Sequence, residues 1–212
     1  MTPPTTLTRS TIVRAALALM DAEGLATFSL PRLADELGIK TPSLYHHFRD
    51  RSELLSEVAR FVVLETPRPT TADDAPWTEY FAELARSFRR TILRHGNAAP
   101  VLLQFLPREV MTPLYELAAV RLADLTDLPA EMHVVVLDGL EKLTLGSAIV
   151  EASHGPDAVV GAFRDVDAET HPRLAKAAAA NAMDADALFD AAVDAFLSGI
   201  ALGHPSAKRR RR

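Results

Sequence analysis

Eight hydroxyl, imidazole or basic side chains lie close together between positions 40 and 51, in the stretch KTPSLYHHFRDR. Thr41, Ser43 and His46 can form hydrogen bonds with base edges in a DNA major groove, and Lys40 can reach bases or phosphates. The remaining members suit phosphate contacts, and they are Tyr45, His47, Arg49 and Arg51. The chemistry that this stretch offers is recognition of double-stranded DNA, although each residue taken singly is also typical of an ordinary surface.

A short helix over about 42–48 would divide this stretch into an inner and an outer face. At about 100° per residue, Leu44 and Phe48 fall on the inner side, whereas Ser43 and His46 fall on the outer side. Thr41 is the expected N-cap, with Pro42 at the first helical position. Because so short a helix depends on the elements packed against it, its neighbours must hold it in place.

The residues before this helix predict the element that supports it, a helix over 29–37. Ser29 is its expected N-cap, and Gly38 ends it in the left-handed conformation. Arg32 on its surface can brace the DNA backbone. A helix, a short turn that contains glycine and a second helix form the layout of a DNA-reading helix-turn-helix.

Two longer helices are expected to flank this unit within an N-terminal domain of residues 1–65. Thr8 is the expected N-cap of the first, and Gly24 ends it. Asp50 is the expected N-cap of the second, with Glu53 at the spacing of a capping box. The predicted domain is a three-helix helix-turn-helix fold followed by a connecting helix.

The rest of the chain predicts an all-α fold with no strand. Residues 66–75, TPRPTTADDA, read as a linker. Helical patterns follow at 77–95, 98–106, 109–125, 130–153, 168–180 and 185–202, with a loop over 154–166. We expect residues 76–204 to form a helical-bundle domain for ligand binding and dimerisation. The basic residues 205–212 are expected to form a disordered tail, with weak contacts to DNA phosphates as the alternative.

Composition excludes several classes of protein. The 212 residues include no cysteine, so disulfides and thiolate chemistry are excluded. No run approaches the ~18 apolar residues of a membrane span, and the first residues do not resemble a signal peptide, so we expect a cytoplasmic protein without membrane contacts. The net charge of -5 counts mildly against DNA binding, because it is not the usual footprint of such a protein.

No catalytic or metal motif is evident in the sequence. There is no nucleophile elbow, phosphate loop or metal-spaced set of His and Glu. His46 and His47 would point about 100° apart on a helix, so they are poorly placed to share one metal ion. We expect no enzyme activity, no metal and no cofactor. A helix-turn-helix module that binds protein rather than DNA stays open as an alternative, and a helical-bundle enzyme is less favoured.

Residues 7–59, LTRSTIVRAALALMDAEGLATFSLPRLADELGIKTPSLYHHFRDRSELLSEVA, resemble the N-terminal domain of the tetracycline-repressor (TetR) family. The segments LADELGI, SLYHHF and RDRSELL carry this resemblance in combination. The later segments PWTEYF, GSAIVE and FDAAVDAFLSGIA are similar, more weakly, to the C-terminal domain of the branch nearest the tetracycline repressors.

The resemblance implies a dimeric transcription regulator, usually a repressor, that a small ligand releases from a palindromic DNA operator. Carried onto this chain, it implies base contacts from Lys40, Thr41, Ser43 and His46, and phosphate contacts from Tyr45, His47 and Arg51. Leu30 and Pro31 depart from the tetracycline repressors, which carry polar base contacts there. His46 replaces a tryptophan of that branch, so we expect a different operator.

The dimer is expected to form through the last helix and the long helix at 130–153. Small residues recur every four positions in the last helix, which allows a second helix to approach closely. The predicted interface residues are Gly139, Gly146, Ala191, Ala195, Phe196, Gly199 and Gly203. Such a dimer would place two recognition helices ~34–36 Å apart. The alternative is that both sets of small residues pack only within one subunit.

The ligand is expected to bind inside the C-terminal domain, between positions 77 and 151. The candidates combine an apolar wall with polar groups, and they are Phe88, Ile92, His95, Leu103, Gln104, Phe105, Leu143 and Thr144. Glu141, Glu151 and His154 could supply charge. Because the residues that hold tetracycline are not recognisable here as a set, we expect another apolar or amphipathic small molecule.

Overall fold

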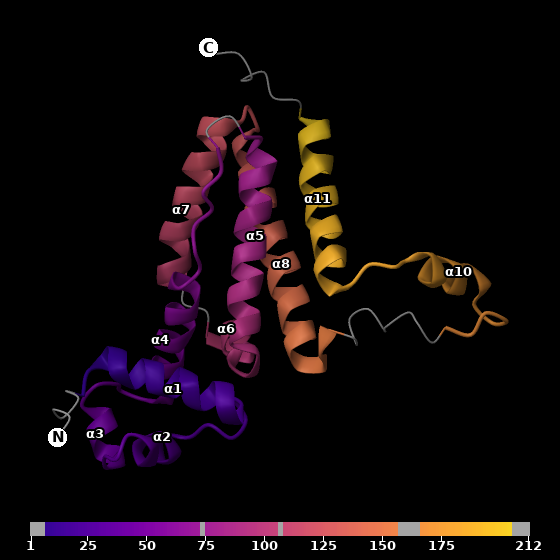
Figure 1. Cartoon of the computed structure of the whole chain (residues 1–212). Helices are drawn as coiled ribbons and strands as arrows, with labels where there is room; N and C mark the ends of the chain where they lie inside the picture. Colours follow the sequence, from indigo (N-terminus) through magenta and orange to yellow (C-terminus); the bar gives the residue numbers. More distant parts are fainter. Residues whose placement is uncertain (1–6, 73–74, 106–107, 157–165, 205–212) are drawn as a thin grey trace.

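The computed structural model describes residues 7–72, 75–105, 108–156 and 166–204, all of them in helices, turns or loops without strands. The molecule is elongated, with α1, α2 and α3 at one end and the long helices running away from them (Figure 1). Within the described ranges, no helix is both long and apolar enough to cross a bilayer. The predicted tail at 205–212 and most of the predicted loop at 154–166 lie outside the described residues.

The first two helices begin and end at the predicted signals. Helix α1 spans Arg9–Glu23, and the Thr8 hydroxyl accepts a hydrogen bond from the amide of Thr11 at 3.1 Å. Helix α2 spans Leu30–Glu36 and is capped by Ser29. Gly24 and Gly38 follow the two helices with φ of 85° and 66°, a region that favours glycine.

Helix α3 spans Thr41–Tyr45 and is shorter than the predicted 42–48. The prediction of Thr41 as N-cap was wrong, because Lys40 occupies that position without a side-chain hydrogen bond. The amide of Ser43 donates to the carbonyl of Lys40 at 2.8 Å, so the helix starts one residue earlier. After Tyr45 the chain continues as a turn, in which the amide of Phe48 donates to the carbonyl of Leu44 at 3.0 Å.

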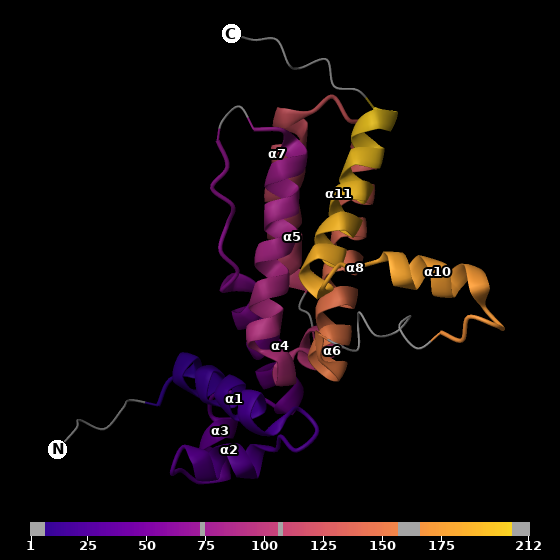
Figure 2. The same cartoon turned by 45° about the vertical axis from the view of Figure 1, so that its right-hand side comes forward.

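The next helices carry the chain along the bundle and back. Helix α4 spans Arg51–Leu64, with Asp50 as its N-cap. The linker then runs along the bundle, so that α5 (Trp77–Arg94) starts at the far end and returns toward α1 (Figures 1 and 2). A hydrogen bond of 2.9 Å from the Ser87 hydroxyl to the carbonyl of Pro67 ties this linker to α5.

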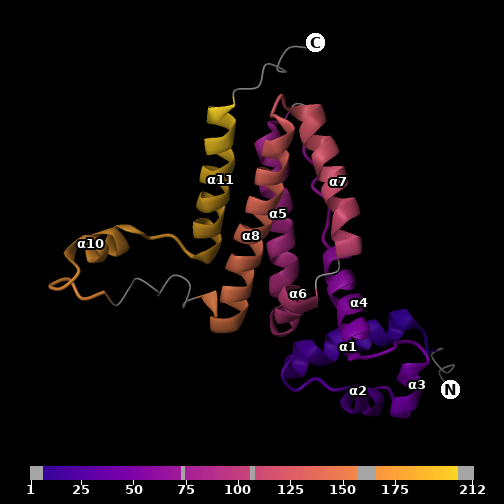
Figure 3. The same cartoon turned by 180° about the vertical axis from the view of Figure 1, so that it is seen from behind.

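The remaining elements complete the bundle. A 3-10 turn, η1 (Gly96–Ala98), and the short α6 (Pro100–Phe105) lie near α1, and the long α7 (Arg108–Leu125) and α8 (Ala130–His154) follow. Helix α10 spans Pro172–Ala180, starting later than predicted, and it projects from the bundle with no buried residue (Figures 1 to 3). Helix α11 (Ala185–Gly203) packs on α5 and α8.

Two hydrophobic clusters form the core, and the first crosses the predicted domain boundary. It joins the buried residues of α1 to α4 with Ile92, Val101, Leu102 and Ala148 from the C-terminal helices. The second fills the far half of the bundle around Phe81. The helix-turn-helix end and the near end of the bundle therefore share one core, and packing can transmit a displacement between them.

Candidate DNA-binding face and effector cavity

Helix α3 presents the two faces that its sequence predicted. Leu44 and Phe48 are buried, with 1% and 3% exposure, in the first hydrophobic cluster. Tyr45, at 55% exposure, and His46 are exposed. Lys40 is exposed too, while the half-buried members of the predicted set are Thr41, Ser43 and His47. A polar outer face over an apolar inner face suits a helix that enters a DNA groove.

Arg9 of α1 holds the end of α3 in place, and the sequence reasoning missed it. Its guanidinium donates to the backbone carbonyl of His47 and, at 3.0 Å, to the carboxylate of Glu53. It also lies 4.3 Å from the ring centroid of Phe48, at cation–π distance. Because its partners are 38 and 44 residues away, no local pattern could have identified this role.

Glu53 connects the turn after α3 to the start of α4. Its carboxylate accepts a hydrogen bond of 2.7 Å from the backbone amide of Arg49. This bond and the one from Arg9 lower the pKa of Glu53 to about 2. The guanidinium of Arg49 lies 3.2 Å from Glu53, and Arg51 lies 5.6 Å over the ring of Phe28. Glu53 therefore positions Arg49, at which a phosphate contact is predicted.

Arg32 has protein partners in addition to its predicted DNA role. Its guanidinium pairs with Glu23 at 2.6 Å and with Glu36 at 3.0 Å. The hydrogen bonds to these two carboxylates raise the pKa of Arg32. The contacts brace α2 against the end of α1, so Arg32 also supports the geometry of the helix-turn-helix.

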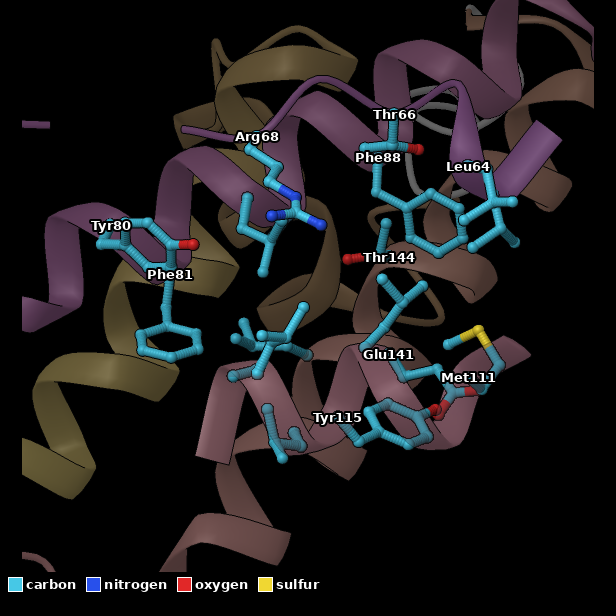
Figure 4. Close-up of a pocket in the computed structure, with 18 residues that line it drawn as sticks. Leu64, Thr66, Arg68, Tyr80, Phe81, Phe88, Met111, Tyr115, Glu141 and Thr144 are labelled. Atoms are coloured by element: carbon cyan, nitrogen blue, oxygen red, sulfur yellow. The ribbon is translucent and has the colours of Figure 1, made fainter. Parts of the chain in front are cut away.

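A cavity of about 220 Å³ lies between α4, the linker, α5, α7 and α8 (Figure 4). One water needs only about 10–15 Å³, so the space suits a small organic molecule. Apolar side chains make up most of its wall, among them Val63, Leu64, Phe81, Leu84, Phe88, Met111, Leu114, Leu137 and Leu140. Its polar groups are Thr66, Arg68, Tyr80, Tyr115, Glu141 and Thr144. We call this space the effector cavity.

The polar groups of the effector cavity differ in how they are engaged. The Tyr115 hydroxyl donates a hydrogen bond to Glu141, and burial together with this carboxylate raises the pKa of Tyr115. The hydroxyl oxygen of Thr66 is buried without a hydrogen-bond partner among the described residues. The guanidinium of Arg68 points into the cavity from the linker (Figure 4). Within the described ranges, no cluster of three or more His, Asp or Glu could hold a metal ion.

The structure brings only two of the predicted ligand-binding residues, Phe88 and Thr144, to the effector cavity. The other six do not line this cavity, and three of them lie on α6, which packs against α4 at the base of the bundle. Ile92 is fully buried in the first hydrophobic cluster, and Phe105 packs against it. Leu103 and Gln104 are exposed on α6, and Leu143 is half-buried on α8 away from the cavity wall.

His95 joins the base of the bundle to the helix-turn-helix end instead of lining the cavity. Its Nδ1 lies 2.7 Å from the carboxylate of Asp21 on α1, and its Nε2 lies 3.0 Å from that of Glu65 after α4. The side-chain amide of Asn97 donates to the backbone carbonyl of Asp21 at 2.7 Å. These contacts attach the end of α5 to both flanking helices of the DNA-binding end.

The two remaining charge candidates, Glu151 and His154, also have partners within the protein. Glu151 pairs with Arg89, which is buried to 3% exposure and also pairs with Asp186 of α11. Arg89 lies 5.0 Å over the ring of Phe189, so this ion pair joins α5, α8 and α11. The Nδ1 of His154 lies 3.1 Å from the backbone carbonyl of Val150 on its own helix.

The predicted dimer residues divide into an internal pair and an outer surface. A Cβ at Gly139 would collide with the ring of Phe196, so these two residues pack α8 against α11 within one chain. This contact fits the alternative of packing within a subunit. Gly146, Gly199 and Gly203 face open space, Ala195 is exposed and Ala191 is half-buried. The exposed apolar residues on these helices include Val134, Val135 and Leu202.

A helix-turn-helix with a polar outer face, joined through one core to a helical bundle with an amphipathic cavity, defines a class of proteins. The class is that of DNA-binding transcriptional regulators that respond to a ligand.

Comparison with known families places the chain within this class. Residues 12–58 match the family of bacterial regulatory proteins, tetR family. Residues 68–202 match the tetracyclin repressor-like C-terminal domain. The chain belongs to the tetR family of bacterial regulatory proteins.

Two of the similar curated proteins are named as repressors. The tetracycline repressor protein class E of Escherichia coli is 29% identical over 147 residues, which are 66% of this chain and 66% of that protein. The HTH-type transcriptional repressor DrrR1 of Streptomyces coeruleorubidus is 32% identical over 144 residues, 65% of this chain and 52% of that protein. The matched part thus spans about half to two thirds of these relatives.

Solved structures extend the similarity to nearly the whole chain. The TetR family protein ActR of Streptomyces coelicolor, in complex with actinorhodin, is 29% identical with a TM-score of 0.78, covering 95% of this chain and 100% of that one. A single-residue variant of TetR from Acinetobacter baumannii AYE, in complex with minocycline, is 22% identical with a TM-score of 0.73. The match covers 97% of this chain and 100% of that one. The second similarity shows the fold alone.

Proposed function

We propose that this protein is a dimeric cytoplasmic repressor that leaves a palindromic operator when a small amphipathic molecule enters the effector cavity. One observation carries the proposal: Val63 and Leu64, at the end of α4, form part of the cavity wall. Helix α4 begins directly after the turn that follows α3. A molecule in the cavity therefore contacts an element that positions the recognition helix.

The DNA contacts in this proposal come from the outer face of α3 and its surroundings. Lys40, Thr41, Ser43 and His46 contact base edges, which supply sequence preference. The residues that contact phosphates are Tyr45, His47, Arg49 and Arg51, with Arg32 bracing α2. The exposure of Tyr45, His46 and Lys40 supports this assignment.

The dimer in this proposal forms through the outer surfaces of α8 and α11. Gly146, Gly199 and Gly203 leave open space in which a second helix can approach closely, and Ala195 adds little bulk. The exposed Val134, Val135 and Leu202 supply apolar area on the same two helices. A two-fold interface of this kind repeats the same contacts in both subunits.

Coupling between the effector cavity and DNA requires two arrangements of α4 that a ligand distinguishes. The shared core and the His95 contacts with Asp21 and Glu65 supply the connection between the bundle and the DNA-binding end. The relatives named as repressors and the ActR complex with actinorhodin support a ligand-released repressor as the mode of action.

Selection of DNA from a randomised duplex pool with the full chain tests this proposal. We expect enrichment of a palindrome whose half-site centres lie about one helical turn apart, bound by a dimer. The complex should contain two chains per duplex by light scattering. Absence of enrichment over several rounds, or recovery of single half-sites bound by one chain, would contradict the proposal.

A further inference from the structure

The effector cavity carries two charged groups that have no oppositely charged partner among the residues that the structure describes. Arg68 enters from the linker and Glu141 from α8 (Figure 4), and apolar side chains form most of the wall around them. The guanidinium of Arg68 forms no hydrogen bond or ion pair with any residue that the structure describes, Glu141 included. Lys142, the next residue in the sequence after Glu141, pairs with Asp138 at 2.6 Å.

Arg68 offers a binding position for an anionic group. A guanidinium keeps its charge in proteins, and its planar array of N–H donors matches a carboxylate in a two-point contact. Apolar side chains line the space beside it, so one ligand can place an anionic group at Arg68 and bury its apolar body in the cavity. An apolar ligand that carries an anionic group near its edge would therefore gain affinity at this position.

Glu141 imposes the opposite requirement on the other part of the ligand. One of its carboxylate oxygens accepts the hydrogen bond from Tyr115, and the raised pKa of that phenol keeps the proton in place. The second oxygen accepts no hydrogen bond from the described residues. A second anion would be repelled here, whereas a hydroxyl or N–H group would donate to the available oxygen.

Building on the proposed function, we propose that the effector is an amphipathic organic anion that bears a hydrogen-bond donor. Its single carboxylate-like group pairs with Arg68 at the linker, its apolar body fills the space beside Phe88, Leu84 and Leu140, and its hydroxyl or N–H group donates to Glu141. Neutral and cationic molecules of the same skeleton satisfy only part of this arrangement.

A matched set of probes tests this ligand class on the full chain without DNA. The probes are 6-hydroxy-2-naphthoate, its primary amide, and 2-naphthoate, which lacks the hydroxyl group. Calorimetric titration at neutral pH should show the hydroxynaphthoate binding about tenfold more tightly than its amide. Its advantage should shrink as salt rises, because Arg68 is exposed and its attraction is screened.

Variants assign the preference to the two residues. Arg68→Gln should reduce the ratio of acid to amide affinity to about one, and Arg68→Lys should keep part of it, since the charge remains but the planar fork is lost. Glu141→Gln should keep the preference for the acid over the amide. It should reduce the ratio of the affinity of 6-hydroxy-2-naphthoate to that of 2-naphthoate. Arg173→Gln, the same charge change on the projecting α10, serves as the control and should behave as the unmodified chain. Circular dichroism melting should confirm that each variant is folded.

Three results would overturn the proposed ligand class. They are equal affinity for acid and amide, an acid preference that survives Arg68→Gln in a folded protein, and failure of every probe to bind. These results leave the proposed regulator function standing if the chain still selects a palindrome from the DNA pool. Conversely, a chain that selects no DNA but shows the acid preference would contradict the regulator function alone.

Discussion

At the scale of single residues, the outer face of α3 was predictable and its support was not. The helical period alone separates the buried Leu44 and Phe48 from the exposed His46. The contacts of Arg9 with His47 and Glu53 join residues that are far apart in sequence, so only the fold reveals them. For the same reason the roles of Arg68 and Tyr115 in the effector cavity could not be read from their neighbours.

The base and phosphate contacts should respond differently to substitution. Ser43→Ala or His46→Ala should relax the preference for the selected operator over a mismatched one. The binding free energy for the selected operator should weaken by about 1–3 kcal/mol. Fluorescence anisotropy with matched and mismatched duplexes measures this difference. If both variants keep the full preference, α3 does not read bases through these two side chains.

Arg51→Ala should weaken binding to all DNA sequences about equally. It should also lower the salt slope of the binding constant by about 1, since one phosphate contact is lost. Arg60→Ala, more than two turns further along α4, should leave both quantities unchanged. An unchanged slope in Arg51→Ala would show that the proposed docking is wrong.

Glu53 should make the DNA-binding end sensitive to acid. Its pKa falls from 4.5 to about 2 on folding, so its stabilising contribution is present above about pH 4.5 and is lost as pH falls toward 2. Glu53→Gln should lack this part of the pH dependence when acid unfolding is followed by circular dichroism. Glu116→Gln, on the exposed surface of α7, should unfold as the unmodified chain does. Identical pH profiles for Glu53→Gln and the unmodified chain would contradict this role.

At the scale of helices, capping residues set most boundaries and packing set the others. Thr8, Ser29 and Asp50 cap helices as predicted, because each signal lies within four residues of the amide that it binds. Helix α3 starts at Thr41 and ends at Tyr45, before the predicted end at 48. So short a helix depends on packing against its neighbours, and its local sequence therefore does not fix where it ends. The predicted ligand residues on α6 lie away from the effector cavity, because an apolar pattern does not say which element it will face.

The buried Arg89 should hold three helices together. Arg89→Met leaves Glu151, whose side chain is 12% exposed, without its cation. We expect unfolding free energy to fall by about 3–5 kcal/mol, the usual effect of removing one partner from a buried pair. Arg90→Met removes an exposed ion pair with Glu83 and should change stability by less than about 0.5 kcal/mol.

Urea titration monitored by circular dichroism compares these two variants directly. A loss in Arg89→Met no larger than that in Arg90→Met would show that the junction of α5, α8 and α11 does not depend on this charge.

At the scale of the whole molecule, the continuity of the core was not predictable from the sequence. The linker composition indicated a boundary near residues 66–75, and the helical patterns placed the bundle after it. The first hydrophobic cluster nevertheless crosses that boundary, and the linker itself contributes Thr66 and Arg68 to the effector cavity. Contacts between distant segments decide such features, and a single sequence does not display them.

The dimer should depend on the outer surface of α11. Gly199→Arg introduces a long charged side chain where the proposed interface needs close approach, so it should yield a folded monomer with weakened operator binding. Ala179→Arg on the projecting α10 provides the matched control. Light scattering at micromolar concentration measures the oligomeric state of both variants. A Gly199→Arg protein that remains dimeric would exclude the outer surface of α11 as the dimer interface.

The central claim is that the chain binds operator DNA through two copies of α3. Fluorescence anisotropy of the selected duplex and a scrambled duplex, each titrated with the full chain across a salt series, tests it most directly. We predict tighter binding to the selected duplex and a linear fall of log affinity with log salt concentration, with a slope of about -0.9 for each phosphate contact. Equal affinity for both duplexes, or binding that does not change with salt, would contradict the claim.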